Sequence, residues 1–404
     1  MSRKLFKNDS MKVSITLLVA CLLLSSCSEE APSPAESFFK IYDDSNFDLN
    51  YDPIDVVEVI DGYIILAGTE QDNSNFEGIQ LLRVDEEGLF KDSEETAFTD
   101  YESPVGDLYF DSADSSMYFF AKIKGFRDAS LISINPSLEV QDISAPLGIG
   151  YPLAAAATSS SGLIIQSYDP VNLQTEISEV TLAGVPSGAA RYSIGPGEDV
   201  EEDVIDHFLE TNVNPFPFFC GEVSPGNYYF NGFYNYSFSL VFTDLSDSPT
   251  RVVSGQGIDA GVRGIMPLAG GNFAVAGFQF DDNYQLGSNP LTAGNAGDLY
   301  PGNLVEIRPY TTSKILNYSG AGESYTVFAS ETKGNQIVLH FYNAATGEID
   351  GVHYIGFLNR FNLATVKVTA DESIIVLGTT FIAGRFERIF LNKISPREIS
   401  RIVG

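Results

Sequence analysis

Short apolar segments of about four to eight residues alternate with polar stretches along most of the chain. The apolar segments are rich in β-branched and aromatic residues, and the stretches between them are rich in glycine, aspartate, asparagine and serine. This pattern predicts short β-strands joined by turns. After the N-terminal region, the sequence shows no long helical segment and no further hydrophobic span. It therefore predicts an all-β protein.

One apolar phrase returns along the chain, first as GYIILAG and later as GNFAVAG and ESIIVLG. Its spacing averages roughly 52 residues, which is the length of one blade of a β-propeller. An apolar strand precedes each phrase, and a third strand and a more polar fourth strand follow it. A lone four-stranded sheet cannot bury both faces, whereas blades stacked around an axis cover one another. The seven phrases begin at Gly62, Ser116, Gly162, Gly226, Gly271, Gly334 and Glu372.

The repeats predict a single β-propeller domain over residues 37–404, with seven four-stranded blades. Six blades are the alternative, because only about 38 residues separate the sixth phrase from the seventh, and the sixth repeat reads as one strand short. The last repeat ends after its third strand, while an apolar strand at residues 37–42 precedes the first repeat. We therefore expect residues 37–42 to complete the last blade and join the two termini. Glycine at the ends of the second strand suits tight turns and crowded contacts between blades.

The N-terminus has the organisation of an export signal. Four basic residues lie within the first 12 positions, and residues 13–24 form an apolar run too short for an ordinary transmembrane helix. The run ends in LSSC, which resembles the lipobox of bacterial lipoproteins and implies cleavage before Cys27 and lipidation of its thiol. LVAC, which ends at Cys21, is the rival motif, and Met11 is an alternative start.

This resemblance divides the N-terminal region into a lipoprotein signal peptide at residues 1–26 and a flexible tether at residues 27–36. The polar, proline-containing sequence after Cys27 suits an exposed linker. Ser28 rather than an aspartate follows the cysteine, which in the lipoprotein family is compatible with transfer to the outer membrane. The resemblance therefore implies attachment to the outer membrane through a lipid anchor, with the protein facing the periplasm or the cell surface.

The signal and the repeats together resemble bacterial β-propeller lipoproteins over nearly all of the mature chain. The phrase DGYIILAGT, with a third strand such as IQLLRVDEEG, is similar to repeats of exported bacterial propellers. That resemblance implies a fold and not a chemistry. The chain has no tryptophan, so it departs from the WD40 pattern and from the propeller lipoproteins that help assemble outer-membrane proteins.

The composition narrows the range of partners. The formal net charge is −31 and the isoelectric point is about 4.2. Such a negative field repels phosphate backbones, so we expect no binding to nucleic acid, and it suits a soluble monomer. Hydrophobic residues make up 44% of the chain, which indicates a folded protein rather than a disordered one.

Few residue patterns point to catalysis. The motifs HExxH and GxSxG and the P-loop are absent from the sequence. The histidines His207, His340 and His353 are scattered, and we expect His340, in an apolar strand, to be a hydrogen-bonded core residue. Lipidation of Cys27 would leave Cys220 without a disulfide partner, and Cys220 is expected to be a small buried strand residue. We therefore predict no catalytic residues, and no cofactor unless Ca²⁺ binds.

Three segments are candidate binding sites, and two of them interrupt the regular period. Residues 197–211 have the apolar spacing of an amphipathic helix with an acidic face, and residues 280–303 form a long segment without periodicity. Residues 43–52 alternate acids and amides, as a Ca²⁺ loop does, but lack the glycine and the final glutamate of an EF-hand. For each segment a purely structural role is the alternative. The candidate residues are Glu201, Glu202 and Asp206 in the first, Tyr284 and Tyr300 in the second, and Asp44, Asn46 and Asp48 in the third.

The sequence favours a non-catalytic propeller that binds a protein or glycan partner at the cell surface or in the periplasm. An extracellular carbohydrate-active hydrolase or lyase on the same scaffold is the first alternative. Carboxylates, arginine and tyrosine around the propeller axis would favour that enzyme. A structural or adhesive surface protein is the second alternative, which a flat apolar patch on the rim would favour.

Overall fold

The computed structural model divides the chain into two units, residues 1–35 and Glu36–Gly404. It describes residues 36–43, 50–69, 77–195, 200, 217–257, 259–280, 282–292, 294–299, 302, 304–311, 313–320, 322–382 and 386–404. The predicted signal peptide, Cys27 and all but the last residue of the predicted tether lie outside these ranges. In the part that is described, no helix is long and apolar enough to span a membrane.

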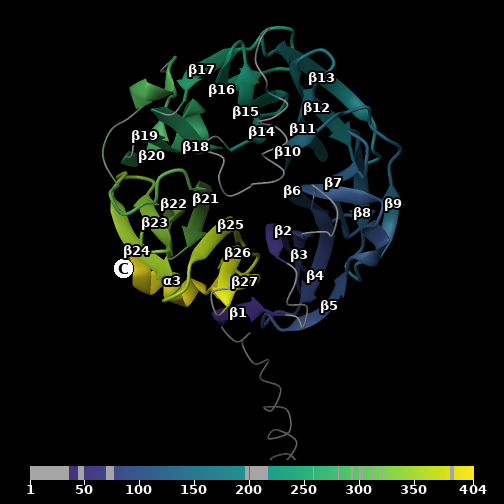
Figure 1. Cartoon of the computed structure of the whole chain (residues 1–404). Helices are drawn as coiled ribbons and strands as arrows, with labels where there is room; N and C mark the ends of the chain where they lie inside the picture. Colours follow the sequence, from purple (N-terminus) through teal and green to yellow (C-terminus); the bar gives the residue numbers. More distant parts are fainter. Residues whose placement is uncertain are drawn as a thin grey trace, which may run out of the picture. The chain divides into compact units, whose positions relative to one another are not determined.

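The second unit is a ring of seven antiparallel sheets, as predicted (Figure 1). The first three blades are β2 (Tyr51–Val59), β3 (Gly62–Thr69), β4 (Gly78–Val84) and β5 (Phe90–Glu94); β6 (Tyr101–Asp111), β7 (Ser116–Ile123), β8 (Ala129–Ile134) and β9 (Val140–Ile143); and β10 (Pro152–Ala157), β11 (Gly162–Asp169), β12 (Gln174–Thr181) and β13 (Pro186–Ser193). The fourth and fifth are β14 (Phe219–Ser224), β15 (Asn227–Tyr234), β16 (Ser237–Thr243) and β17 (Arg251–Gln256); and β18 (Ala260–Pro267), β19 (Phe273–Gln279) and β20 (Asp282–Asn289).

The last two blades bring the ends of this unit together. The sixth is β21 (Ser313–Gly320), β22 (Glu323–Glu331), β23 (Ile337–Asn343) and β24 (Ile349–Ile355), and the seventh is β25 (Phe361–Val368), β26 (Ile374–Ile382), β27 (Phe386–Ile394) and β1 (Phe38–Tyr42). Three 3₁₀ turns, at Thr96–Phe98, Ala269–Gly271 and Ala296–Leu299, and the helix α3 (Pro396–Val403) complete the described elements.

The interpretation of the sixth repeat was wrong in one respect. The phrase that begins at Gly334 leads into β23, the third strand of its blade, and the true second strand is β22. Because β22 starts at Glu323, the spacing to both neighbouring phrases returns to roughly 50 residues. The sixth sheet therefore has four strands, and it is the fifth sheet that has three among the described residues. The six-blade alternative is excluded.

The predicted ring closure is confirmed. β1 pairs antiparallel with β27, from Phe38 opposite Lys393 to Tyr42 opposite Ile389. The Phe39 ring stacks on Phe390, with 5.6 Å between the ring centroids. The first and the last strands of the propeller thus belong to one sheet, and this pairing covers the edge of β27 that would otherwise be exposed.

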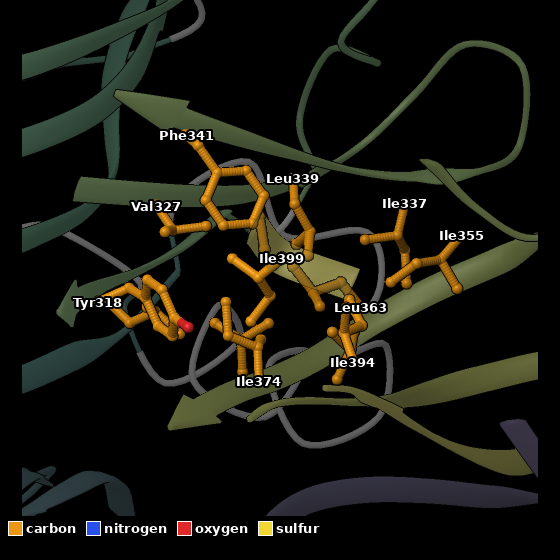
Figure 2. Close-up of a cluster of buried hydrophobic side chains, with 14 of the residues drawn as sticks. Tyr318, Val327, Ile337, Leu339, Phe341, Ile355, Leu363, Ile374, Ile394 and Ile399 are labelled. Carbon is orange, nitrogen blue, oxygen red and sulfur yellow. The ribbon is translucent and has the colours of Figure 1, made fainter. Parts of the chain in front are cut away.

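Each pair of neighbouring blades encloses its own hydrophobic core. Figure 2 shows the core between the sixth and seventh blades, where Val327 and Phe341 face Ile374. Ile399 of α3 closes the same core, and the Ser395 side chain caps this helix by accepting a hydrogen bond from the Glu398 amide. Because both faces of a blade are covered, the second strands are apolar throughout rather than alternating, as in β3, where every residue is buried.

The role predicted for glycine in the second strand is also confirmed. Gly62 has a φ of 141°, and a Cβ atom there would lie 2.0 Å from the Val84 carbonyl oxygen. A Cβ atom at Gly378 would lie 2.0 Å from the Asn362 carbonyl oxygen. Neither position has room for a side chain, so backbone packing requires glycine at these places in the first and seventh blades.

Deletion of residues 37–42 tests the closure. Loss of β1 exposes the β27 edge and removes the Phe38 and Phe39 rings, so we expect the free energy of unfolding to fall by at least ~3 kcal/mol, the cost of one large buried side chain. Thermal unfolding followed by circular dichroism measures the effect. Deletion of residues 28–33 is the control and leaves every described strand in place. Equal melting temperatures for the two deletions would contradict the closure.

Candidate functional site

The two ends of the ring differ in their connections. We call the end at which β2, β6, β10, β14, β18, β21 and β25 begin the loop face, and the opposite end the anchor face. These inner strands contact one another in sequence around the ring (Figure 1). Hydrogen bonds between neighbouring connections mark the loop face, including Ser103 N to Glu77 O at 2.7 Å and Phe361 N to Asn335 O at 3.0 Å.

All three candidate segments lie in the sequence between strands whose neighbouring ends are at the loop face. Residues 43–52 include the connection from β1 to β2, residues 197–211 lie between β13 and β14, and residues 280–303 lie between β19 and β21. Glu201, Glu202, Asp206, Tyr300, Asp44, Asn46 and Asp48 lie outside the described residues. Val200, the one described residue of the predicted amphipathic helix, is 2% exposed and packs in the core between the third and fourth blades.

The assignment of Tyr284 to a ligand-binding loop needs correction. The structure places Tyr284 in β20, opposite Gly277 of β19, within a segment that was expected to be aperiodic. Its side chain is 2% exposed and packs in the core between the fourth and fifth blades. Burial also raises the pKa of its hydroxyl group. Tyr284 is therefore a core residue that a ligand at the surface does not reach.

Large apolar side chains stand at the tips of the loop face. Their exposed fractions range from 38% at Leu173 to 89% at Leu358. They come from the second to the fifth blades and from the connections that follow the fifth and sixth, so they extend around most of the ring. We call this set the apolar tips: Phe126, Val171, Leu173, Tyr236, Phe280, Val305, Phe357 and Leu358.

Four of the apolar tips have a backbone conformation that bulky residues rarely adopt. The φ angles are 53° at Leu173, 69° at Tyr236, 52° at Phe280 and 73° at Leu358. This left-handed region costs a non-glycine residue roughly 1 kcal/mol or more, and glycine fits it without strain. A bulky apolar side chain that is both exposed and strained contributes little to folding at that position.

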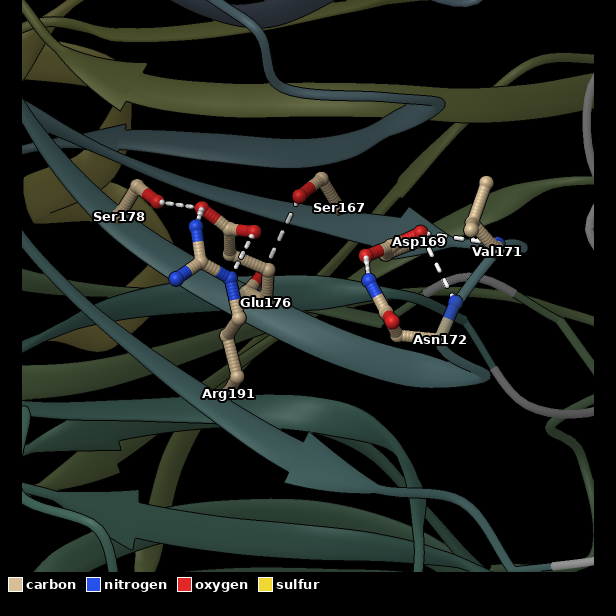
Figure 3. A network of polar contacts seen from close by, with 7 residues as sticks. All are labelled: Ser167, Asp169, Val171, Asn172, Glu176, Ser178 and Arg191. Atoms are coloured by element: carbon tan, nitrogen blue, oxygen red, sulfur yellow. Dashed lines mark hydrogen bonds and ion pairs between the residues drawn. The ribbon is translucent and has the colours of Figure 1, made fainter.

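Hydrogen bonds hold one of these loop tips in place, as Figure 3 shows. Asp169, at the end of β11, accepts hydrogen bonds from the Val171 amide at 2.9 Å and from the Asn172 side chain at 2.6 Å. Burial alone would raise the pKa of Asp169, but these hydrogen bonds lower it overall. Nearby, Arg191 forms a two-fold ion pair with Glu176, with N–O distances of 2.8 and 3.1 Å. Val171 is thus presented by an ordered turn.

A cavity of about 670 Å³ lies at the centre of the ring and is lined by the inner strands of all seven blades. Five of these strands have a β-bulge near the loop face, where the register with the second strand shifts by one residue. A bulge redirects a side chain out of the regular alternation. The bulge residues, all of which line the cavity, are Ile54, Ser103, Leu153, Arg263 and Ala364.

Charged side chains of both signs line this cavity. The acids are Asp52, Glu77, Asp107 and Glu222, and the bases are Arg263, Lys314 and Lys367. Behind the wall, buried Asp55 accepts hydrogen bonds from the Lys367 ammonium group at 2.6 Å and from the Leu108 amide at 2.7 Å. Asp55 therefore joins the first blade to the second and the seventh.

Two cavity residues have shifted pKa values. Enclosure by the surrounding protein and repulsion from Asp55 raise the pKa of Asp107, although Lys367 and Lys314 act in the opposite direction. The Asp107 side chain is exposed to solvent within the cavity that it lines. Burial lowers the pKa of Arg263 to about 9, and its guanidinium group lies 5.4 Å from the centre of the Phe278 ring.

The predictions for His340 and Cys220 are confirmed. His340 is buried in β23, and its Nε2 atom is 2.9 Å from the Glu306 carboxylate. Cys220 is buried in β14, and burial raises the pKa of its thiol, which makes it a poor nucleophile. Among the residues that the structure describes, no group of three or more histidine, cysteine, aspartate or glutamate side chains is arranged to hold a metal ion.

The sequence patterns did not point to the charged residues of the cavity. Lys314 and Lys367 are single bases within the apolar first strands SKILNYSG and FNLATVKV. A charged residue inside an otherwise apolar inner strand is the signal that was available. The first strands of all repeats would have to be aligned with one another to show that such residues meet at the axis.

Comparisons with known proteins support the propeller fold but do not assign the chain to a family. No known family model matches the chain, and no curated protein matches it. A catalytically inactive virginiamycin B lyase from Staphylococcus aureus, solved with quinupristin, is 12% identical, with 89% of this chain and 100% of that chain covered and a TM-score of 0.51. The core factor of S. cerevisiae is 10% identical, with 93% of this chain and 63% of that chain covered and a TM-score of 0.50.

A third similar structure is the β-propeller domain of the Trilobed protease from Pyrococcus furiosus. It is 8% identical, with 85% of this chain and 95% of that chain covered and a TM-score of 0.46. At 12% and 10% identity, the first two of these similarities support the fold alone and say nothing about chemistry.

Substitution of Asp55 by alanine tests its role as a link between blades. The change leaves Lys367 and the Leu108 amide without their partner, so we expect a loss of about 3 kcal/mol in the free energy of unfolding. The control is Asp61→Ala, which removes the partner of Arg83 at the surface and should cost less than about 1 kcal/mol. Denaturant unfolding of both variants gives the comparison, and equal losses would contradict the role of Asp55.

Proposed function

We propose that this protein is a lipid-anchored binding module of the outer membrane, whose loop face docks a protein partner. The observation that carries the proposal is the set of exposed, bulky apolar residues with positive φ angles: Leu173, Tyr236, Phe280 and Leu358. Selection for folding alone would favour glycine or a polar residue at these positions. Solvent-exposed apolar residues that gather on one face are typical of interaction surfaces.

A protein fits the loop face better than a glycan does. Four of the eight apolar tips are aliphatic and offer no ring on which a sugar could stack, namely Val171, Leu173, Val305 and Leu358. On the anchor face the exposed large apolar residues are fewer and gather mainly at the first blade, in Ile60, Leu89 and Phe90. The loop face also carries the long connections, which are the usual place for binding residues in a rigid scaffold.

The position of β1 supports an orientation relative to the membrane. Residue 36 precedes β1 at the anchor face, where the Ser37 hydroxyl donates a hydrogen bond to the Ser395 hydroxyl at 3.0 Å. A tether from Cys27 to this point spans at most about 35 Å when fully extended. Lipidation at Cys27 would thus attach the protein from its anchor face, on the side opposite the loop face.

An enzyme is the second candidate function. The cavity brings together the groups expected of one, namely carboxylates such as Asp107, the guanidinium of Arg263 and the phenol of Tyr229. The similarity to virginiamycin B lyase supports the scaffold only. Against an acid–base role for histidine, His340 and His353 lie on the third and outer strands of the sixth blade and do not line the cavity.

Glycine substitutions at the apolar tips separate binding from folding. The double variant Phe280→Gly/Leu358→Gly relieves the strained φ angles, so the melting temperature should stay equal or rise, while the amount of cross-linked partner should fall at least about tenfold. In-cell cross-linking followed by quantitative mass spectrometry gives the measurement.

The control for this variant is Glu372→Gly, at an exposed anchor-face turn with a φ of 63°. It should leave the partner yield unchanged. A yield that the double variant does not lower would overturn docking at the loop face. If the partner proves to be a polysaccharide, the proposal of a protein partner is wrong and the glycan alternative replaces it.

Substitution of Cys27 by serine tests the anchor. We expect the variant to take up no radiolabelled palmitate and to leave the membrane fraction, because the acyl chains supply the attachment. Cys21→Ser is the matched control and should keep both label and fractionation. If Cys21→Ser loses the label and Cys27→Ser keeps it, the lipid is attached at Cys21, in the rival motif LVAC.

A further inference from the structure

The wall of the central cavity is divided by charge and polarity among the blades. The fifth, sixth and seventh blades contribute one base each, in Arg263, Lys314 and Lys367. The acids come from the first, second and fourth blades. The third blade contributes no charge, since its part of the wall is the run from Leu153 to Ala157. The cavity therefore has a cationic side, an anionic side and an apolar side.

Most of these charges are engaged by the protein itself. Lys367 pairs with Asp55 at 2.6 Å, and Glu222 accepts a hydrogen bond from the Ser159 amide at 2.6 Å. Arg263 is 4% exposed, lies against aromatic rings and is held by the charge of Glu331. Each of these groups thus has a partner within the protein, and one carboxylate oxygen of Glu222 accepts no hydrogen bond from a described residue.

Lys314 and Asp107 differ from the other charged groups. Both side chains are exposed within the cavity. Lys314 forms no ion pair with any other residue that the structure describes, and Asp107 accepts a hydrogen bond from the Ala157 amide. The two are close enough for the charge of Lys314 to affect the ionisation of Asp107, but they do not pair directly. They supply the same cavity with a cation from the sixth blade and an acidic group from the second blade.

We propose that the central cavity binds a small zwitterion with an apolar body, such as an amino acid or a short peptide with free termini. Its carboxylate would bind Lys314 and its ammonium group would bind Asp107, while the body lies against Leu153 and the alanines of β10. Charge-assisted hydrogen bonds at both ends would fix the orientation of the ligand. The cavity volume of about 670 Å³ is within the usual range for small-molecule sites.

This site does not depend on docking at the loop face, because different residues carry the two proposals. A zwitterion also suits a protein with a net charge of −31, since it experiences less long-range repulsion than an anion of the same size. The local bases are then needed only for the carboxylate end.

Calorimetric titration of the full-length protein in detergent tests the proposal with four probes: tri-alanine, N-acetyl-tri-alanine, tri-alanine amide and L-leucine. Tri-alanine should bind, and either cap should weaken binding at least about tenfold because it removes one charged contact. L-leucine that binds more tightly than tri-alanine would identify the free amino acid as the ligand, and the reverse order would identify the peptide.

Variants assign each end of the ligand. Lys314→Met should weaken tri-alanine binding and abolish the difference between tri-alanine and its amide, and Asp107→Asn should do the same for the acetylated peptide. The controls are Lys333→Met and Asp92→Asn, which alter exposed residues outside the cavity and should change nothing. Absence of binding by both tri-alanine and L-leucine, or equal binding of capped and free peptides, would overturn the proposal. Either outcome leaves the test of the loop face intact.

Discussion

The whole structure depends on one constraint, which is that each blade is apolar on both faces and must be covered on both sides. A strand such as β3 is buried along its entire length, so a blade without two neighbours would expose a continuous hydrophobic surface. The seven core clusters correspond to the seven interfaces between neighbouring blades, and none is shared by three blades. The ring is therefore stable only when it is closed. Pairing of β1 with β27 is the step that closes it in the chain.

Closure also determines where chemistry is placed. Seven inner strands converge on one axis, and their side chains must either fill the centre or surround a cavity. Here the bulges near the loop face and the small residues of β10 leave room, and charged side chains from distant parts of the sequence meet there. The chain folds so that the first and last inner strands, β2 and β25, lie side by side, which is why Asp55 reaches Lys367. The connections between strands are free to vary at the two faces, and the longer ones gather at the loop face.

The repeated phrase predicted the propeller architecture because the physical causes of the phrase are local. Glycine at positions such as Gly62, the apolar second strand and the turn residues each obey short-range rules that the sequence displays directly. The sixth phrase was misassigned because β22 and β23 are both apolar strands of similar length, and only pairing distinguishes the second from the third. Tyr284 was misplaced because a single tyrosine between polar residues carries no mark of burial. The meeting of Asp107 with Lys314 is a product of ring closure, which no local pattern encodes.

The interface between the fifth and sixth blades shows how such a ring tolerates a weak junction. Its apolar cluster is the smallest of the seven, with four buried residues, and the fifth sheet has three strands among the described residues. A polar contact supplements the apolar ones there, since the Gln285 side chain of the fifth blade donates a hydrogen bond to the Ser330 hydroxyl of the sixth at 3.3 Å. In an open row of blades this junction would be the first to separate. In a closed ring, separating it requires the other interfaces to deform as well, so a polar junction beside the cavity is tolerated. Arg263 lies at the cavity wall next to this junction, where burial lowers its pKa to about 9 and the charge of Glu331 acts in the opposite direction.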